Sequence, residues 1–454
     1  MKLTPELTKG LFGIEIEEHR VDINSKTISQ IKHNHELGDR RTQPYFQTDF
    51  SESMEELVTA PQDTVKKSHQ QLHNLQKILQ LKLTKQEIIW PFSMPPKMNQ
   101  ADVDFLENHF ERYWYVDYRK TLIQKYGLFQ HIMCGIHVSY SPNEEIILNY
   151  QQEKQISDYQ TAKNELLFMI ARQLTGYRWL ITYLFGSSIQ DFNENDNIPT
   201  EIKHKHPFVK SWRSSKYGFA NQQDIDVSYD NFADFETSLN EYIQNGTLFA
   251  KSEFYGPVRL KTLKGHAETQ IDYLEFRMLD NDPFSAEGLD RRTLYFIHLL
   301  IIDVLVNQNH WSKLELQENR NYNNVVALSE PNQALNEEYA FKANQLFKRL
   351  KVIANEIDNP EYQSTITWIE AMLKNPNETI AGRLFKIKAG EQLGLELGMK
   401  YKKFFQDSPF INVPTPVISL YQSALCQGDL VKEMTDNSIT VETQNGEIQK
   451  REIK

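Results

Sequence analysis

The sequence predicts an α+β protein in which a mostly antiparallel sheet is surrounded by helices. Strand-like patterns are few and lie far apart, at residues 11–21, 56–59, 131–140 and 272–280. Long stretches of helical periodicity separate them, and this order does not follow the regular strand–helix alternation of a parallel sheet. Along the strand patterns, apolar and polar side chains alternate, which is typical of strands with one face against a core.

The composition is that of a folded protein without a dedicated nucleic-acid surface. The 454 residues are 40% hydrophobic, 11% aromatic and 24% charged, which excludes a disordered chain. The net charge is −11 and the basic residues are not segregated, so we expect no nucleic-acid partner. Two cysteines, Cys134 and Cys426, cannot form a disulfide framework and suit a reducing cytoplasm.

No segment predicts a membrane span or a leader. The first ten residues, MKLTPELTKG, lack the apolar core of a signal peptide. The most apolar run, residues 294–306, contains His298 and Asp303 and is too short to cross a bilayer. We therefore expect this run to be a buried helix, and the protein to be cytoplasmic and free of membrane partners.

The helical stretches define one main domain. They lie at residues 65–83, 155–185, 285–307, 336–357 and 380–405. In the last stretch Gly390, Gly394 and Gly398 recur every four residues, which predicts a helix face packed closely against another element. We expect residues 1–404 to form the main domain. Residues 405–454, with Pro414, Pro416 and a polar end, are predicted to be a peripheral segment or tail of it.

The first strand carries acidic residues on one face. Alternation places Glu15, Glu17 and His19 on the side opposite Ile14 and Ile16. Residues two apart lie roughly 6.5–7 Å from each other, so two carboxylates there repel unless a cation bridges them. A divalent cation such as Mg²⁺ takes such oxygen ligands. The alternative is a solvated acidic strand face.

A second acidic segment follows at residues 48–61. Asp49, Glu52, Glu55 and Glu56 crowd it, and the alternative to a ligand cluster is the acidic first turn of a helix.

The third strand adds imidazoles. Alternation places His131, His137 and Ser139 on one face, and Cys134 on the other, where a buried structural thiol is favoured over a nucleophile.

The fourth strand pairs an acid with a guanidinium. Glu275 and Arg277 share a face, so the carboxylate can bind a metal and the arginine can bind phosphoryl oxygens. The alternative is an ordinary cross-strand ion pair.

Together the four strands predict a sheet that serves metal-assisted phosphoryl chemistry. The sequence has neither a G-x-x-x-x-G-K-[ST] loop nor G-x-G-x-x-G, so a nucleotide would be held by metals and arginines.

Several blocks in collinear order resemble the bacterial (type 1) glutamate–cysteine ligase family, also called γ-glutamylcysteine synthetase. They run from Gly13 to Ser285 and are GIEIEEHRV, TDFSESMEELVTAP, IWPFSMPP, YRKTLIQKYG followed by GIH, YLFGSS, and YLEFRMLDNDPFS. The resemblance implies a glutamine-synthetase-like catalytic sheet within a ligase domain. It also implies ligation of the glutamate γ-carboxylate to the amine of cysteine through γ-glutamyl phosphate, the first step of glutathione biosynthesis. ATP would be the co-substrate and Mg²⁺ the cofactor, with Mn²⁺ as an alternative.

The resemblance also implies roles for individual residues. The family's metal ligands fall on Glu15, Glu17, Asp49, Glu56, His137 and Glu275. Its phosphate-contacting arginine falls on Arg277, which with Glu275 makes the predicted catalytic pair. The family's residues on the acceptor amino acid's side of the site fall on Phe50, Tyr118, Arg119, Arg213 and Tyr255.

The chain departs from the family pattern at a few positions. His131, Cys134 and Ser139 stand where the family usually has Gln, Ser and Asn; Phe219 replaces a tyrosine, and His19 an apolar residue. One interpretation is divergence within one activity. The other is a changed amino-acid pocket, in which His131, Ser139 and Phe219 join the substrate-binding residues.

Two further hypotheses stay open. The same ligase chemistry could serve a different amino acid or amine, or the chain could be a non-catalytic paralogue that binds an amino acid or nucleotide. In each case the expected partners are small molecules. The chain ends without the second nucleotide-binding domain of fused glutathione-making enzymes, so we expect any second step to belong to a separate protein.

Overall fold

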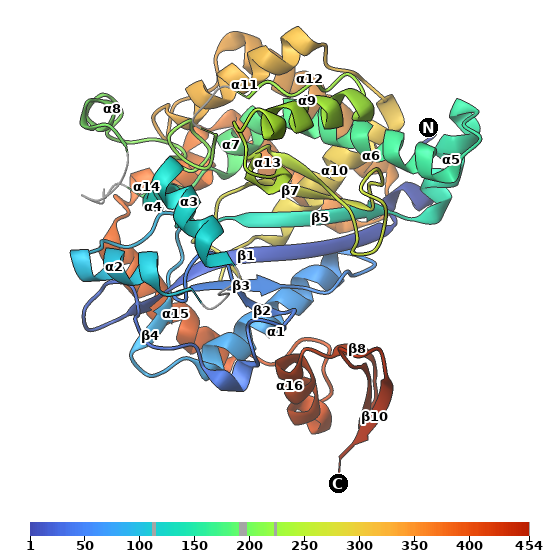
Figure 1. Ribbon diagram of the computed structural model, residues 1–454. Coiled ribbons are helices and arrows are strands. Elements are labelled where there is room, and N and C mark those ends of the chain that lie inside the picture. The colour runs from blue at the N-terminus through green and yellow to red at the C-terminus, as the bar shows by residue number, and fades with distance from the viewer. Residues whose placement is uncertain (111–114, 190–197, 222–224, 454) are drawn as a thin grey trace.

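The computed structural model describes residues 1–110, 115–189, 198–221 and 225–453. A seven-stranded sheet lies at its centre, as Figure 1 illustrates. The strands are β1 Gly10–Asp22, β2 Phe46–Thr48, β3 Met54–Val58, β4 Glu87–Ile89, β5 Ile136–Pro142, β6 Val258–Lys261 and β7 Tyr273–Leu279. Their order is β2-β3-β1-β5-β7-β6, β4 pairs with the end of β1, and each of these pairs is antiparallel. The predicted α+β class and antiparallel sheet are confirmed.

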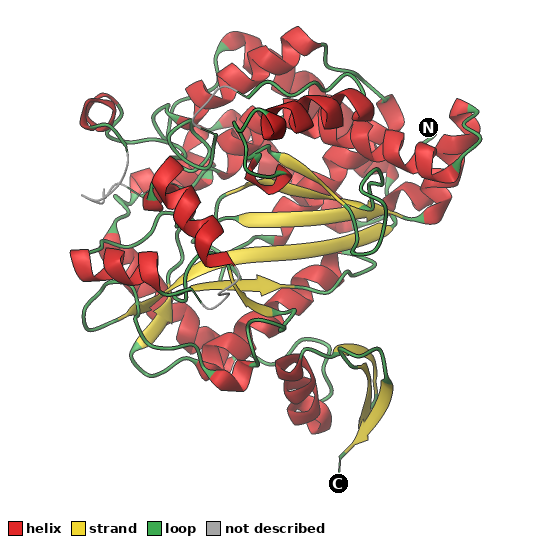
Figure 2. Ribbon diagram, in the orientation of Figure 1, coloured by secondary structure: helices red, strands yellow, loops and turns green. Residues whose placement is uncertain are grey.

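Helices surround this sheet (Figure 2). They are α1 Val65–Lys82, α2 Gln100–Asn108, α3 Val116–Tyr126, α4 Leu128–His131, α5 Glu144–Lys154, α6 Tyr159–Gly176, α7 Arg178–Phe185, α8 Thr200–Lys205, α9 Phe232–Gln244, α10 Arg291–Asn307, α11 Lys313–Ala327, α12 Glu337–Glu356, α13 Pro360–Lys374, α14 Ile380–Lys386, α15 Glu391–Asp407 and α16 Ile418–Gln427.

Helices α1 and α10 cover the apolar face of the central strands. Ile14 of β1 and Val138 of β5 lie against Val65 of α1 and against Leu294 and Ile297 of α10. Alternation along β1 therefore directs Glu15 and Glu17 to the opposite face. The apolar run at 294–306 is the buried body of α10, as predicted. Among the described residues no helix is both long and apolar enough to cross a membrane.

Two of the predicted long helices are each divided. Residues 155–185 form α6 and α7, which meet at Tyr177. Gly176 ends α6 where the indole of Trp311 packs so closely that a Cβ would overlap it. Residues 380–405 form α14 and α15, separated by a turn in which Lys388 has φ +51°.

The glycine stripe is confirmed at two of its three positions. Gly394 and Gly398 of α15 lie against Trp90 and Ile88, with no room for a Cβ. Gly390 instead caps the N-terminus of α15.

The third strand is shorter than predicted. The prediction of residues 131–140 is wrong at its start, because His131 ends the short helix α4 and β5 begins at Ile136. His131 therefore does not share a strand face with His137.

The C-terminal segment forms a small layer at one end of the molecule (Figure 1). It holds α16 and a three-stranded sheet of β8 Leu430–Met434, β9 Ser438–Glu442 and β10 Ile448–Glu452. Gln43, which precedes β2, donates to the backbone carbonyls of Leu425 and Cys426, and Tyr45 donates to that of Asp429. Helix α15 continues to Asp407, across the predicted division at residue 404, and that division stays a prediction.

Candidate active site

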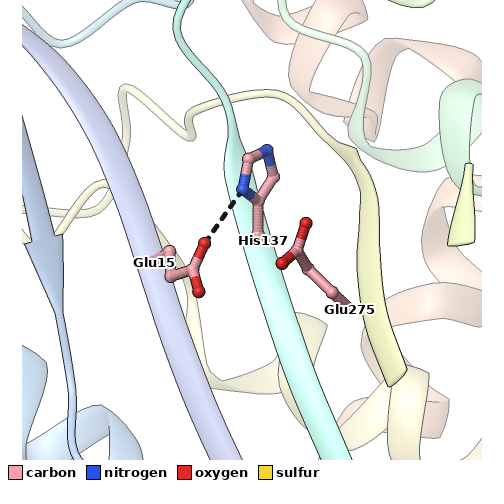
Figure 3. A group of neighbouring side chains, drawn as sticks. All are labelled: Glu15, His137 and Glu275. Atoms are coloured by element: carbon pink, nitrogen blue, oxygen red, sulfur yellow. Dashed lines mark hydrogen bonds and ion pairs between the residues drawn. The ribbon is translucent and has the colours of Figure 1, made fainter. Parts of the chain in front are cut away.

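Three neighbouring strands bring Glu15, His137 and Glu275 together (Figure 3). Glu15 of β1 lies opposite His137 of β5, and a bulge near residues 136–138 shifts β7 so that Glu275 lies opposite Ser139. One ligand atom from each of the three residues lies within 4.8 Å of the other two. The His137 Nδ1 atom is 3.3 Å from Glu15 Oε2. We call these residues the Glu15 cluster.

A second cluster lies beside it and consists of Glu17, Asp49 and Glu56, again with atoms within 4.8 Å of one another. Glu17 lies opposite Glu56 of β3, and Asp49 stands in the turn between β2 and β3. That turn is closed by Thr48, whose hydroxyl donates to the Ser51 carbonyl. We call this the Glu17 cluster. His137 connects the two clusters, because its Nε2 atom is 3.6 Å from Glu17 Oε1.

Burial and mutual repulsion dominate the Glu17 cluster. Burial, and then the neighbouring Asp49, raise the pKa of Glu17 to about 8. One Glu17 oxygen accepts a hydrogen bond from the Gly135 amide. Three carboxylates this close are a costly arrangement unless a cation neutralises them.

Positive groups surround Glu275 in the Glu15 cluster. Its oxygens lie 3.1 Å from Arg277 Nε, 3.6 Å from Arg259 Nη1 and 2.7 Å from Lys261 Nζ. Burial by itself would raise the pKa of Glu275, but Arg277, with help from His137 and the other two cations, holds it well below its ordinary value. Burial and then Arg277 lower the pKa of His137, which favours the neutral imidazole that a metal ion requires.

All six predicted ligands therefore lie in these two clusters, whereas the other acidic residues of the second segment do not. Residues 48–53 form a turn that leads into β3, and the helical alternative for this segment is wrong. Glu55 faces away from Glu56 and pairs with Arg20 and Arg40. Cys134 is fully buried, which raises the pKa of its thiol well above the usual value, as expected for a structural cysteine.

The predicted arginines meet over an aromatic ring. The Phe219 ring centroid lies 4.7 Å from the Arg277 guanidinium carbon and 5.6 Å from that of Arg213. Arg213 Nη1 donates to the Leu279 carbonyl at the end of β7. The Phe219 ring also packs on Tyr255, with 4.5 Å between centroids.

His131 lies in the same aromatic group although it is not on the strand. It stacks on Phe50 with 5.1 Å between ring centroids and meets the edges of Tyr126 and Tyr255. The Arg119 guanidinium carbon lies 5.6 Å from the Phe50 ring. Tyr118 packs on the side of this group, with its hydroxyl 3.3 Å from that of Ser252.

Two other residues that depart from the family pattern, Ser139 and His19, lie at two edges of the site. Ser139 lies opposite Gly13 and Glu275, so it borders the Glu15 cluster. His19 is fully buried and its Nε2 atom is 2.8 Å from the Ile132 carbonyl, next to His131. Burial lowers the pKa of His19 to about 4, so it is neutral.

Three residues of the site were not predicted from the sequence. Arg259 and Lys261 alternate on β6 and flank Glu275, and that alternation was a usable signal. Tyr126 ends α3 and had no local signal, because its place in the aromatic group depends on the packing of α3.

Comparison with known proteins decides the family. Residues 1–326 match the family model described as glutamate–cysteine ligase. The chain belongs to the glutamate–cysteine ligase family. Bifunctional glutathione biosynthesis proteins of Streptococcus agalactiae and Streptococcus mutans are 29% and 30% identical to it, over 89% and 88% of the chain. The matches cover 54% and 53% of those relatives, so the chain spans about half the length of the curated relatives it matches.

Solved structures agree with this family. The crystal structure of a bifunctional glutathione synthetase from Pasteurella multocida has a TM-score of 0.88 and 25% identity, and covers 98% of this chain and 60% of its own. A glutamate–cysteine ligase from Francisella tularensis, in complex with AMP, has a TM-score of 0.75 and 22% identity, with 92% of each chain covered. The latter similarity shows that the glutamate–cysteine ligase fold is shared.

Proposed function

We propose that this chain is an ATP-dependent ligase that joins the γ-carboxylate of glutamate to the amine of cysteine, the first step of glutathione biosynthesis. The observation that carries the proposal is the pair of carboxylate clusters joined by His137 on one face of the sheet, with Arg277 beside them. Membership of the glutamate–cysteine ligase family supports the same chemistry.

The donor atoms fit divalent cations. The Glu17 cluster offers carboxylate oxygens, which suit Mg²⁺; the Glu15 cluster adds an imidazole, which Mn²⁺ also accepts. We propose Mg²⁺ as the cofactor and Mn²⁺ as an alternative. When bound, these ions neutralise charge on the phosphates of ATP.

The chain's own residues position the reacting groups. Arg277 is the catalytic residue that contacts the transferred phosphoryl group, since its guanidinium is fixed between Glu275 and the Phe219 ring. The γ-phosphoryl of ATP passes to an oxygen of the glutamate γ-carboxylate and ADP leaves. The acceptor amine then attacks the acyl carbon, loses a proton and expels phosphate, so no covalent bond to the protein is needed.

The acceptor is held by the aromatic group. Phe50, His131 and Tyr255 form walls on which a thiol side chain packs favourably, and Arg119 beside Phe50 is placed to bind the acceptor carboxylate. Because His131 and Phe219 both lie here, a different acceptor is the second candidate. Both candidates involve only small-molecule partners, and two free cysteines agree with a cytoplasmic location.

The first test is phosphate release from ATP and Mg²⁺ in the presence of glutamate, with each amino acid in turn as acceptor. We expect cysteine to give the dominant rate; a dominant rate with another amine would identify the second candidate. No release with any pair would contradict both and favour a non-catalytic paralogue.

The variant Glu275→Gln tests the assignment of the site. It should abolish turnover, because it removes a carboxylate from the Glu15 cluster. The matched control is Glu433→Gln at an exposed position of β8, which should behave as the unaltered chain does. Turnover near that of the control would show that the metal-site assignment is wrong.

A further inference from the structure

A cavity of about 530 Å³ lies beside the proposed active site. Residues of helices α6, α7 and α11 form one side of it. These helices contact one another and lie above the sheet in Figure 1. Backbone segments 214–216, 225–230 and 254–257 form the other side. Among the predicted substrate-binding residues only Tyr255 lines it, so the cavity lies behind the aromatic group and is not part of it.

Arg178, the first residue of α7, lines this cavity, and the only described carboxylate that favours its charge, Asp280, is not in an ion pair with it. Its Nε atom is buried and has no hydrogen-bond partner, and the carboxylates among the described residues form no ion pair with it. Its Nη2 atom donates a long hydrogen bond, 3.4 Å, to the Ser214 carbonyl. Asp280 is instead paired with Arg213, whose Nη1 atom lies 3.9 Å from Asp280 Oδ1. A guanidinium in this position is poised for an anion, since a carboxylate would satisfy both its charge and its donors.

Arg178 also has cationic neighbours. Burial, and then Arg213 and Arg320, lower the pKa of Arg178 to about 10, although Asp280 opposes this shift. An anion on Arg178 would offset this repulsion.

The rest of the cavity is less basic than the surroundings of Arg178. Ile225, Val227 and Leu316 give it an apolar wall. At its exposed rim Asp226 is 3.4 Å from Lys313, whereas Asp230 forms no ion pair with a described residue and accepts a hydrogen bond from Ser228. The cavity lining thus combines an exposed carboxylate, a guanidinium and an apolar surface.

We infer that this cavity binds an amino acid or short peptide, with its carboxylate on Arg178, its amino group toward Asp230 and its apolar part on the wall between them. Inorganic phosphate would satisfy Arg178 alone. The volume is in the range of small-molecule sites, roughly 300–1,000 Å³.

Occupancy of the cavity should affect the acceptor end of the active site. Tyr255 is a shared wall, and Ser214 directly follows Arg213 in the chain. If the proposed function is correct, a bound ligand should change KM for the acceptor more than kcat. This consequence rests on the proposed function, whereas binding itself does not.

Calorimetric titration of the full chain without ATP tests the inference. The probes are glycylglycine and each common amino acid other than glutamate and cysteine. At least one probe should bind, with affinity reduced by about tenfold in Arg178→Gln, the loss expected for a charged hydrogen-bonded pair. Affinity should persist in Arg277→Gln, which alters the catalytic site, and in the control Arg291→Gln, whose arginine pairs with Glu361 elsewhere.

A second variant keeps the test independent of folding around the half-buried Arg178. Asp230 is exposed, so Asp230→Asn should fold, should weaken binding of the amino acid and should leave binding of its N-acetyl derivative unchanged. The inference is overturned if no probe binds, if both variants bind like the unaltered chain, or if inorganic phosphate is the one anion that depends on Arg178.

Discussion

Glu55 and Glu56 are neighbours on β3 that face opposite sides of the sheet, so the same substitution should have opposite consequences at the two positions. Glu55 is fully buried, 2.8 Å from Arg20 Nε, and also contacts Arg40 and His33. Burial alone would raise the pKa of Glu55, but Arg40, His33 and Arg20 hold it well below its ordinary value. Removing one partner of a buried ion pair costs about 3–5 kcal/mol, and we expect Glu55→Gln to lower the free energy of unfolding by that amount.

Glu56 is half-buried and belongs to the Glu17 cluster. Glu56→Gln should change the free energy of unfolding by about 1 kcal/mol or less, in line with substitutions outside the core. Turnover should fall by about 100-fold or more, since even the partners of metal ligands cost 10–100-fold. High Mg²⁺ should restore part of the loss.

Two assays on each variant separate the effects. Urea unfolding gives the midpoint and slope, and an unchanged slope shows that the midpoint reports stability. Phosphate release as a function of Mg²⁺ gives turnover, with Glu433→Gln as the control. The reasoning is refuted if Glu55→Gln is as stable as the control, or if Glu56→Gln loses stability while it keeps turnover.

Three further predictions concern other parts of the molecule. Helix propensity favours Gly394→Ala by about 1 kcal/mol, but the new Cβ would overlap the Trp90 indole at a cost of about 1–3 kcal/mol. Urea unfolding should therefore show a net loss of stability, and a gain would contradict this packing. Burial lowers the pKa of Lys210 to about 7. Between about pH 7 and 9 the unfolded chain therefore binds more protons than the folded chain does. The free energy of unfolding should rise with pH over this range, by at most about 1.4 kcal/mol per pH unit. In Lys210→Met, urea unfolding across the same pH range should show no such rise in the free energy of unfolding. If the rise persists in Lys210→Met, another group causes it. Phe219→Leu removes the ring that lies against Arg277 and Arg213, and should lower kcat/KM for the acceptor by about tenfold; kinetics equal to those of the unaltered chain would contradict a positioning role.

Strand alternation was enough to place much of the candidate site. Ile14 and Ile16 must face the core, and this requirement fixes the direction of Glu15 and Glu17 without knowledge of the tertiary structure. Alternation in β5 and β7 likewise places His137 and Glu275 on that face. Register between distant strands had to come from the fold, since nothing local shows that Glu15 lies opposite His137.

Other features depend on contacts that no local pattern encodes. Helix α4 has four residues and begins after Gly127, whose φ is +84°, so His131 looked like a continuation of the following strand. The break between α6 and α7 lies where Trp311 packs, more than a hundred residues later. The Arg178 cavity is formed by segments that are far apart in the sequence, and it had no signal at all.

Four of the five departures from the family pattern lie near one another, whereas Ser139 borders the Glu15 cluster. His19 contacts the carbonyl of Ile132, between His131 and Cys134, and His131 meets Tyr255, on which Phe219 packs. The resemblance implies that the six candidate metal ligands keep the family's residue types, so most of the differences would lie at the acceptor end. Neutral divergence has no reason to follow one chain of contacts, whereas a pocket adapted to another acceptor does. If this explanation is correct, His131→Gln and Phe219→Tyr should be non-additive in kcat/KM for the acceptor, because both act through Tyr255. Additive effects in that double-mutant cycle would instead favour divergence within one activity.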